Sequence, residues 1–164
     1  MTSALIGEAP QTLEFRSCPF DDAPAAALVQ QMREEMAELY DGIDIDNARM
    51  PRAGAAELGP PGGTFVVGFE HGVPVCCGGL KQLPDGACEI KRMFVVPGAR
   101  GRGVARALLG ELERRARSLG YVVARLDTGP LQANAQLIFE RAGYEPIDNF
   151  NKNPLATFFG EKHL

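Results

Sequence analysis

The stretch Arg100-Gly-Arg-Gly-Val-Ala105 joins an apolar run, residues 90–96, to a strongly amphipathic segment. A strand followed by a glycine-bearing loop and then by the start of a helix forms a binding site for anions. The N–H groups of such a loop are unpaired, and the helix dipole adds partial positive charge. Arg100 and Arg102 add full positive charges that suit phosphate oxygens. The sequence therefore predicts that a phosphorylated cofactor binds at this point.

Three types of phosphate-binding loop were weighed against this stretch. A Walker loop requires Lys followed by Ser or Thr after its last glycine, and the chain lacks that pair here. A dinucleotide loop would place its third small residue at position 106, which is Arg106. The acetyl-CoA pyrophosphate loop, Gln/Arg-x-x-Gly-x-Gly/Ala, is matched by Arg100, Gly103 and Ala105. The remaining alternative is a tight strand-to-helix turn with solvated arginines.

The flanking residues resemble the Gcn5-related N-acetyltransferase (GNAT) family well beyond this loop. Residues 89–97 resemble its fourth strand, residues 126–129 the end of its fifth strand, and residues 135–144 its last helix with the closing Gly-Tyr pair. The match covers roughly residues 87–147. The tail, Asn153-Pro154 followed by Phe159-Gly-Glu-Lys162, resembles a bacterial branch of the family whose substrate is uncertain.

The resemblance and the hydropathy pattern together predict an α/β fold in a single domain over residues 11–164, after a loose tail over residues 1–10. We expect a mixed sheet sandwiched by helices, with an antiparallel meander and a parallel pair formed by its fourth and fifth strands. The spacing of Glu113 and Arg117 predicts an ion pair on the outer face of a helix. The pattern predicts strands over 11–17, 64–69, 75–83, 87–96 and 121–127, helices over 23–39, 101–119 and 131–142, and a short helix over 53–58.

Composition narrows the range of partners. A net charge of −4 argues against nucleic acid or an anionic membrane as partner, and no apolar run nears the roughly 18 residues of a membrane span. The two histidines lie far apart and no Cys-x-x-Cys pair occurs, so we expect no metal site. The cysteines are unpatterned and suit a reducing cytoplasm: Cys18, Cys76, Cys77 and Cys88. A homodimer is kept as a possible assembly.

The resemblance implies acetyl-CoA (coenzyme A) as the cofactor. The pyrophosphate would lie on the backbone of Arg100, Gly101, Arg102, Gly103, Val104 and Ala105. The resemblance also implies that Val95 binds the pantetheine arm and that the N–H of Met93 holds the acetyl oxygen. Gln132 stands where the family often has an asparagine, and Phe139 stands where it often has a tyrosine near the sulfur of the cofactor.

Transfer to an amine requires a base. A lysine-like amine has a pKa of about 10.4, so its deprotonation at pH 7 costs about 4.6 kcal/mol. Glu89 lies eleven residues before Arg100, where histone-type members of the family carry their glutamate base. The alternation of a strand places Glu89 on one face with Lys91, Met93 and Val95. The alternative is a glutamate that only pairs with a nearby cation.

Phe139 cannot donate a proton to the departing thiolate. The thiolate would then take its proton from water or from another hydroxyl, or it would leave without a proton. Departure without a proton is feasible because a thiol with a pKa of about 8.5 is a fair leaving group. The same residue keeps open a second class of function, a non-catalytic acetyl-CoA sensor or degenerate module that acts through a partner. Transfer to an alcohol in place of an amine is a third hypothesis.

The loop after the first predicted helix borders the acceptor cleft in this family. Its carboxylates favour a cationic amine, on a small molecule or a peptide, and the predicted substrate-binding residues are Tyr40, Asp41, Asp44 and Asp46. Turns rich in Asp and Asn also occur for purely local reasons. Arg49 and Arg52 follow closely and could instead mark an anionic acceptor, such as an amino-acid carboxylate.

Overall fold

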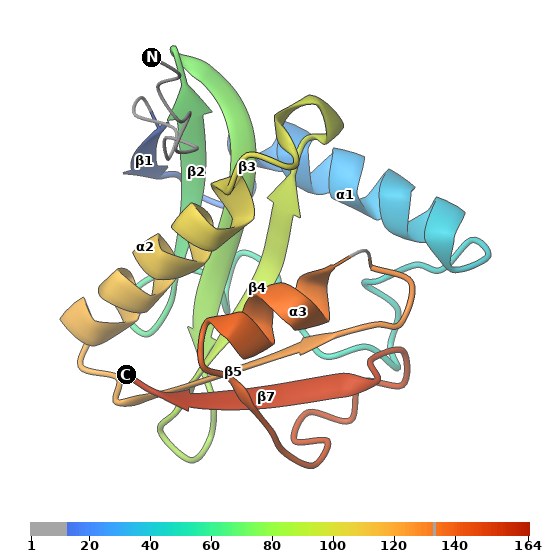
Figure 1. Ribbon diagram of the computed structural model, residues 1–164, viewed down its shortest axis with the longest axis vertical. Helices are drawn as coiled ribbons and strands as arrows, with labels where there is room; N and C mark the ends of the chain where they lie inside the picture. The colour runs from blue at the N-terminus through green and yellow to red at the C-terminus, as the bar shows by residue number, and fades with distance from the viewer. Residues whose placement is uncertain (1–12, 133) are drawn as a thin grey trace, which may run out of the picture.

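Figure 1 shows the computed structural model, which describes residues 13–132 and 134–164. Its strands form one mixed sheet in the order β1-β2-β3-β4-β5-β7-β6. Their bounds are β1 Leu13–Ser17, β2 Thr64–Glu70, β3 Val73–Gln82, β4 Cys88–Val95, β5 Val123–Thr128, β6 Glu145–Pro146 and β7 Phe158–His163. The predicted meander is confirmed as the antiparallel series β2, β3 and β4. Strand β1 also pairs antiparallel with β2, and β5 pairs in parallel with β4. The predicted tail, residues 1–10, lies outside the described residues.

Helices cover both faces of this sheet (Figure 1). Helix α1 (Ala25–Leu39) packs on one face, and α2 (Val104–Ser118) and α3 (Ala135–Arg141) pack on the other. The predicted helix over 53–58 does not form. The segment is a run of turns in which one helical hydrogen bond, from the N–H of Leu58 to the carbonyl of Gly54, is not continued.

Helix α2 is shorter than predicted at its start, because Gly101 and Gly103 have φ near +80° and cannot belong to a right-handed helix. The predicted pair of Glu113 with Arg117 is wrong. Glu113 is buried, and its carboxylate accepts hydrogen bonds from the Tyr144 hydroxyl at 2.8 Å and the Lys162 ammonium at 3.0 Å. Two donors from distant segments thus allow the carboxylate to face inward.

A β-bulge interrupts β4. The pairing passes from Cys77↔Phe94 to Gly79↔Lys91, so two residues of β4 oppose one residue of β3. Arg92 lies in this bulge with φ +59°, in the left-handed region. Pairing of β4 with β5 is confined to Cys88↔Ala124 and Glu89↔Arg125, after which the two strands diverge (Figure 1).

The bulge also exchanges the faces of β4. Ile90 belongs to the core under α2, so Glu89 and Lys91 point to the α1 face of the sheet. Beyond the bulge, Met93 and Val95 pack against the α2 core, whereas Phe94 belongs to the α1 core. The predicted shared face of Glu89 and Lys91 with Met93 and Val95 is therefore wrong, because one extra residue reverses the alternation.

Burial makes three of the four cysteines unreactive. Desolvation raises the pKa of Cys76 and of Cys88 to about 12, and it raises the pKa of Cys77 as well. Because the thiolate is the nucleophile, a maleimide near pH 8 should label only the half-buried Cys18 in the folded protein. Mass spectrometry should show one adduct, none for Cys18→Ser, and four after unfolding in guanidinium. Fast addition of a second label to the folded protein would contradict this.

Candidate active site

The loop between β4 and α2 forms an anion cradle. Gly101 and Gly103 both have left-handed backbone, and no atom lies within 4 Å of a Cβ placed on either. The N–H groups of Gly101, Arg102 and Gly103 donate to no group among the described residues. Successive N–H groups in such a turn, followed by the start of α2, form a concave site for an anion.

Carboxylates hold the two arginines of this loop. The guanidinium of Arg102 lies 2.9 Å from a carboxylate oxygen of Glu70, and that of Arg100 lies 2.7 Å from Glu35 on α1. Arg100 also donates to the carbonyl of Val95 at 2.9 Å. The backbone N–H groups are therefore the unpaired donors of the loop, and Arg100 ties the end of β4 to α1.

The edge of β4 beyond the bulge faces the space left by β5. The N–H of Val96 donates to Val75 of β3, and successive N–H groups of a strand point to opposite edges. By this alternation the N–H groups of Met93 and Val95 point to the β5 side, where pairing has ended. These are the donors for which the family resemblance implies contacts with the acetyl and pantetheine groups of a cofactor.

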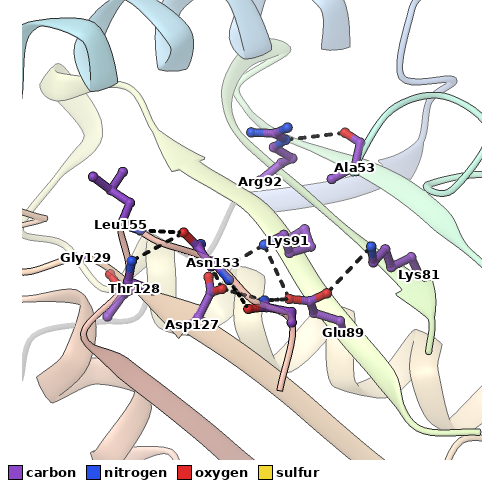
Figure 2. A network of polar contacts seen from close by, with 12 residues as sticks. Ala53, Lys81, Glu89, Lys91, Arg92, Asp127, Thr128, Gly129, Asn153 and Leu155 are labelled. Atoms are coloured by element: carbon purple, nitrogen blue, oxygen red, sulfur yellow. Dashed lines mark hydrogen bonds and ion pairs between the residues drawn. The ribbon is translucent and has the colours of Figure 1, made fainter. Parts of the chain in front are cut away.

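A cluster of charged side chains lies where the two strands part (Figure 2). Glu89 is completely buried between two lysines, with Lys91 Nζ 3.3 Å from Oε2 and Lys81 Nζ 3.8 Å from Oε1. Lys91 also lies 3.6 Å from Asp127, at the end of β5. Glu89 Oε1 has no hydrogen-bond partner among the described residues. A buried oxygen of this kind calls for an explanation, and a role in proton transfer is one.

The segment before β7 completes the cluster. Asn151 donates through its amide nitrogen to Glu89 Oε2 and to Asp127 Oδ2, both at 2.6 Å, and Asn153 donates to Asp127 at 3.0 Å. Asn151 thus bridges a carboxylate of β4 and one of β5. Sequence reasoning missed Asp127, Asn151 and Asn153 as site residues. The available signals are the position of Asp127 at the end of a predicted strand and the alternating asparagines at 149, 151 and 153.

Tyr40 lies apart from the carboxylates that were predicted to bind substrate with it. It follows α1, and its hydroxyl accepts a hydrogen bond from the N–H of Leu131 at 3.0 Å, in the loop after β5. Gln132 belongs to the same loop, where its side-chain oxygen accepts from the N–H of Gly129 at 2.7 Å. Phe139 is buried against Tyr144, with ring centroids 6.3 Å apart.

The acidic loop is largely neutralised within the fold. Asp46 pairs with Arg33 at 2.8 Å and with Arg92 at 2.9 Å, and Asp44 accepts the N–H of Asp46 in a local turn. Burial lowers the pKa of Arg92, and Asp46 partly counteracts this. The guanidinium remains charged. Asp41 is exposed with left-handed backbone. The structure therefore brings together no group of free carboxylates from Asp41, Asp44 and Asp46.

The sequence also matches the acetyltransferase (GNAT) family model over residues 25–144. The chain belongs to this family. The predictions of a GNAT member, of an N-acetyltransferase and of its mixed α/β sheet are confirmed.

Individual relatives agree with this assignment. The GNAT chain is 29% identical to the IAA acetyltransferase of Azospirillum brasilense over 164 aligned positions, which cover 94% of this chain and 99% of the relative. It is similar to a solved GNAT acetyltransferase of Staphylococcus aureus Mu50, with TM-score 0.74, 18% identity and coverage of 93% and 99% of the two chains. It also resembles the PaiA N-acetyltransferase of Thermoplasma acidophilum in complex with coenzyme A, with TM-score 0.66, 16% identity and the same coverage.

None of the described helices has both the length and the apolar character needed to cross a bilayer. Within residues 13–132 and 134–164, no group of three or more His, Cys, Asp or Glu side chains is arranged to hold a metal ion.

Gly103 offers a direct test of the anion cradle. Gly103→Asp should abolish binding of coenzyme A, because a negative side chain would enter the cradle and a non-glycine residue is strained at φ +80°. Gly103→Ala carries the backbone strain without the charge and should retain weakened binding. Isothermal titration calorimetry with coenzyme A measures both, and equal affinity for Gly103→Asp and the parent would exclude this loop as the phosphate site.

Proposed function

We propose that this GNAT protein transfers an acetyl group from acetyl-CoA to a primary amine by direct attack in a ternary complex. The observation that carries the proposal is the open edge of β4. It runs from the anion cradle at residues 100–105 to the buried carboxylate of Glu89. One continuous strand edge thus connects a phosphate site to a candidate base.

The residues present fit acetyl-CoA. The unpaired N–H groups at residues 101–103 suit its pyrophosphate, and the exposed edge at Met93 and Val95 suits its amide-bearing pantetheine arm and its acetyl oxygen. Arg100 could exchange these partners for phosphate, because its guanidinium extends from this loop and binds the carbonyl of Val95 and the carboxylate of Glu35 on α1. The coenzyme A complex of the Thermoplasma relative supports the same cofactor.

Acetyl-CoA supplies the thioester: the amine nitrogen bonds to the carbonyl carbon while the C–S bond breaks. Glu89 takes the proton that the amine loses. Because Glu89 is completely buried, we propose that this proton reaches Oε1 through a water molecule and not by direct contact. Lys91 and Asn151 hold the other oxygen, Oε2, so the carboxylate has one fixed orientation.

This chain has Phe139 where the family often has a tyrosine, and we propose that Tyr40 supplies the missing hydroxyl. Its hydroxyl lies on the loop of Gln132, which the resemblance assigns to the cofactor, and a Cβ on Gly129 would collide with it. Among the described residues this hydroxyl has one hydrogen bond, in which its oxygen accepts the N–H of Leu131, so its own proton is available for the thiolate. We therefore assign Tyr40 the role of proton donor to the sulfur.

Acetyl-CoA with a panel of primary amines tests the function, with release of the free thiol and the mass of the product as readouts. Thiol release and N-acetylated product are expected; cofactor binding without either would favour the sensor, and products from alcohols alone would favour O-acylation.

We also propose that the protein is cytoplasmic, a location that suits its free thiols, and that it forms a homodimer.

Glu89→Gln should lower the rate of acetyl transfer at neutral pH while the affinity for coenzyme A stays within about twofold. The rate should recover as the pH rises toward the pKa of the amine, because the amine then loses its proton without a base. Asp127→Asn is the matched control: it removes a carboxylate that has the same partners, Lys91 and Asn151. Its pH profile should keep the shape of the parent's. Identical profiles for Glu89→Gln and the parent between about pH 6 and 9 would remove Glu89 from the mechanism.

Tyr40→Phe should lower kcat by about tenfold, a small effect for a general acid because the thiolate is a fair leaving group. Phe139→Tyr should leave kcat nearly unchanged in the parent, because Tyr40 already donates the proton there. In the Tyr40→Phe background, Phe139→Tyr should restore part of the loss, since it supplies the hydroxyl at the family's usual place. Single-turnover kinetics measures these rates. An unchanged kcat for Tyr40→Phe would show that the thiolate leaves without this residue.

A further inference from the structure

An open, shallow cavity of about 570 Å³ lies beside the loop after α1, with a volume in the usual range of small-molecule sites. One wall is the loop after α1, with Ile43, Ala48 and Met50, and the other is the turn of Pro154 and Leu155. The lining is mostly apolar, apart from Asn47 and Arg49.

Both walls are anchored to residues at the divergence of β4 and β5. Leu155 follows Asn153, whose amide binds Asp127, and Asn153 in turn accepts the N–H of Leu155 at 2.9 Å. Figure 2 shows Leu155 beside Asn153 and Asp127. On the opposite wall, Asp46 is paired with Arg92 in the bulge. The cavity thus adjoins the charged cluster around Glu89.

Arg49 carries a positive charge that no other residue lining this cavity balances. Its guanidinium has no hydrogen-bond or ion-pair partner among the described residues, and the side chain is exposed. Asp46 does not compensate it, because Arg33 and Arg92 hold that carboxylate, and the charged Asp44 does not line this cavity. A guanidinium beside apolar side chains suits a ligand that carries a carboxylate.

We infer that the acceptor is an amine that also carries a carboxylate and an apolar side chain, with Arg49 binding the carboxylate. This inference rests on the proposed acetyl transfer. The apolar part contacts Ile43, Met50 and Leu155, and the amine is directed toward the cluster of Glu89. Polyamines lack the carboxylate and would bring positive charge to Arg49, so they are poor acceptors.

The test compares leucine, leucinamide and 3-methylbutylamine as acceptors, which share the apolar group and the primary amine but differ in the carboxylate. Leucine should have the lowest KM. Arg49→Gln should raise the KM for leucine about 10- to 100-fold, the size of a lost charge-assisted hydrogen bond, with little change for leucinamide. Arg49→Lys should restore part of the affinity. Arg52→Gln is the matched control, because it removes the same charge from the same loop outside this cavity.

Calorimetric binding of leucine in the presence of coenzyme A separates the two proposals. Leucine that binds through Arg49, while neither leucine nor any other amine of the panel is acetylated, would overturn the proposed transferase and leave the carboxylate site standing. Equal use of leucinamide and leucine, unaffected by Arg49→Gln, would overturn the inference and leave the transferase standing. Spermidine as the preferred acceptor would likewise overturn it.

Discussion

The left-handed backbone of Arg92, inside a strand, is the constraint on which the site depends. A non-glycine residue with φ +59° costs of order 1–3 kcal/mol and persists only where its surroundings hold it. The side chain supplies that hold: the buried guanidinium pairs with Asp46 at 2.9 Å and donates to the carbonyl of Ala53. The resulting bulge turns β4 away from β5 and frees the strand edge at Met93 and Val95.

Side chains then keep the diverging strands apart. Lys91 and Asn151 occupy the space between the carboxylates of Glu89 and Asp127, and both bind each of them. Removing one member of such a buried charge cluster is strongly destabilising, because its partner would remain buried and unpaired. The cluster therefore stabilises the divergence of the two strands and also orients Glu89 Oε1, which has an ion-pair contact with Lys81 but no hydrogen-bond partner among the described residues.

The features that the sequence predicted are local ones. The glycine-bearing loop before α2 and the approximate bounds of β1 to β5 depend on neighbouring residues, and both appear where expected. The bulge could not be predicted, because nothing in the identity of Arg92 signals a left-handed conformation. Asn151 was missed for another reason: its partners lie 62 and 24 residues away in the chain. Glu113 likewise turns inward only because Tyr144 and Lys162 arrive from other elements.

Pairing between distant residues also determines the charge that the loop after α1 presents. Counted along the sequence, residues 41–46 are acidic, whereas in the fold Asp46 is shared between Arg33 and Arg92, and Arg49 is the charged residue that lines the cavity. The ion pair between Arg92 and Asp46 therefore has two effects. It stabilises the bulge beyond which the β4 edge is open, and it engages a carboxylate of the loop after α1. If the proposed assignments hold, the geometry of the cofactor site and the charge preference for the acceptor are coupled through this one contact.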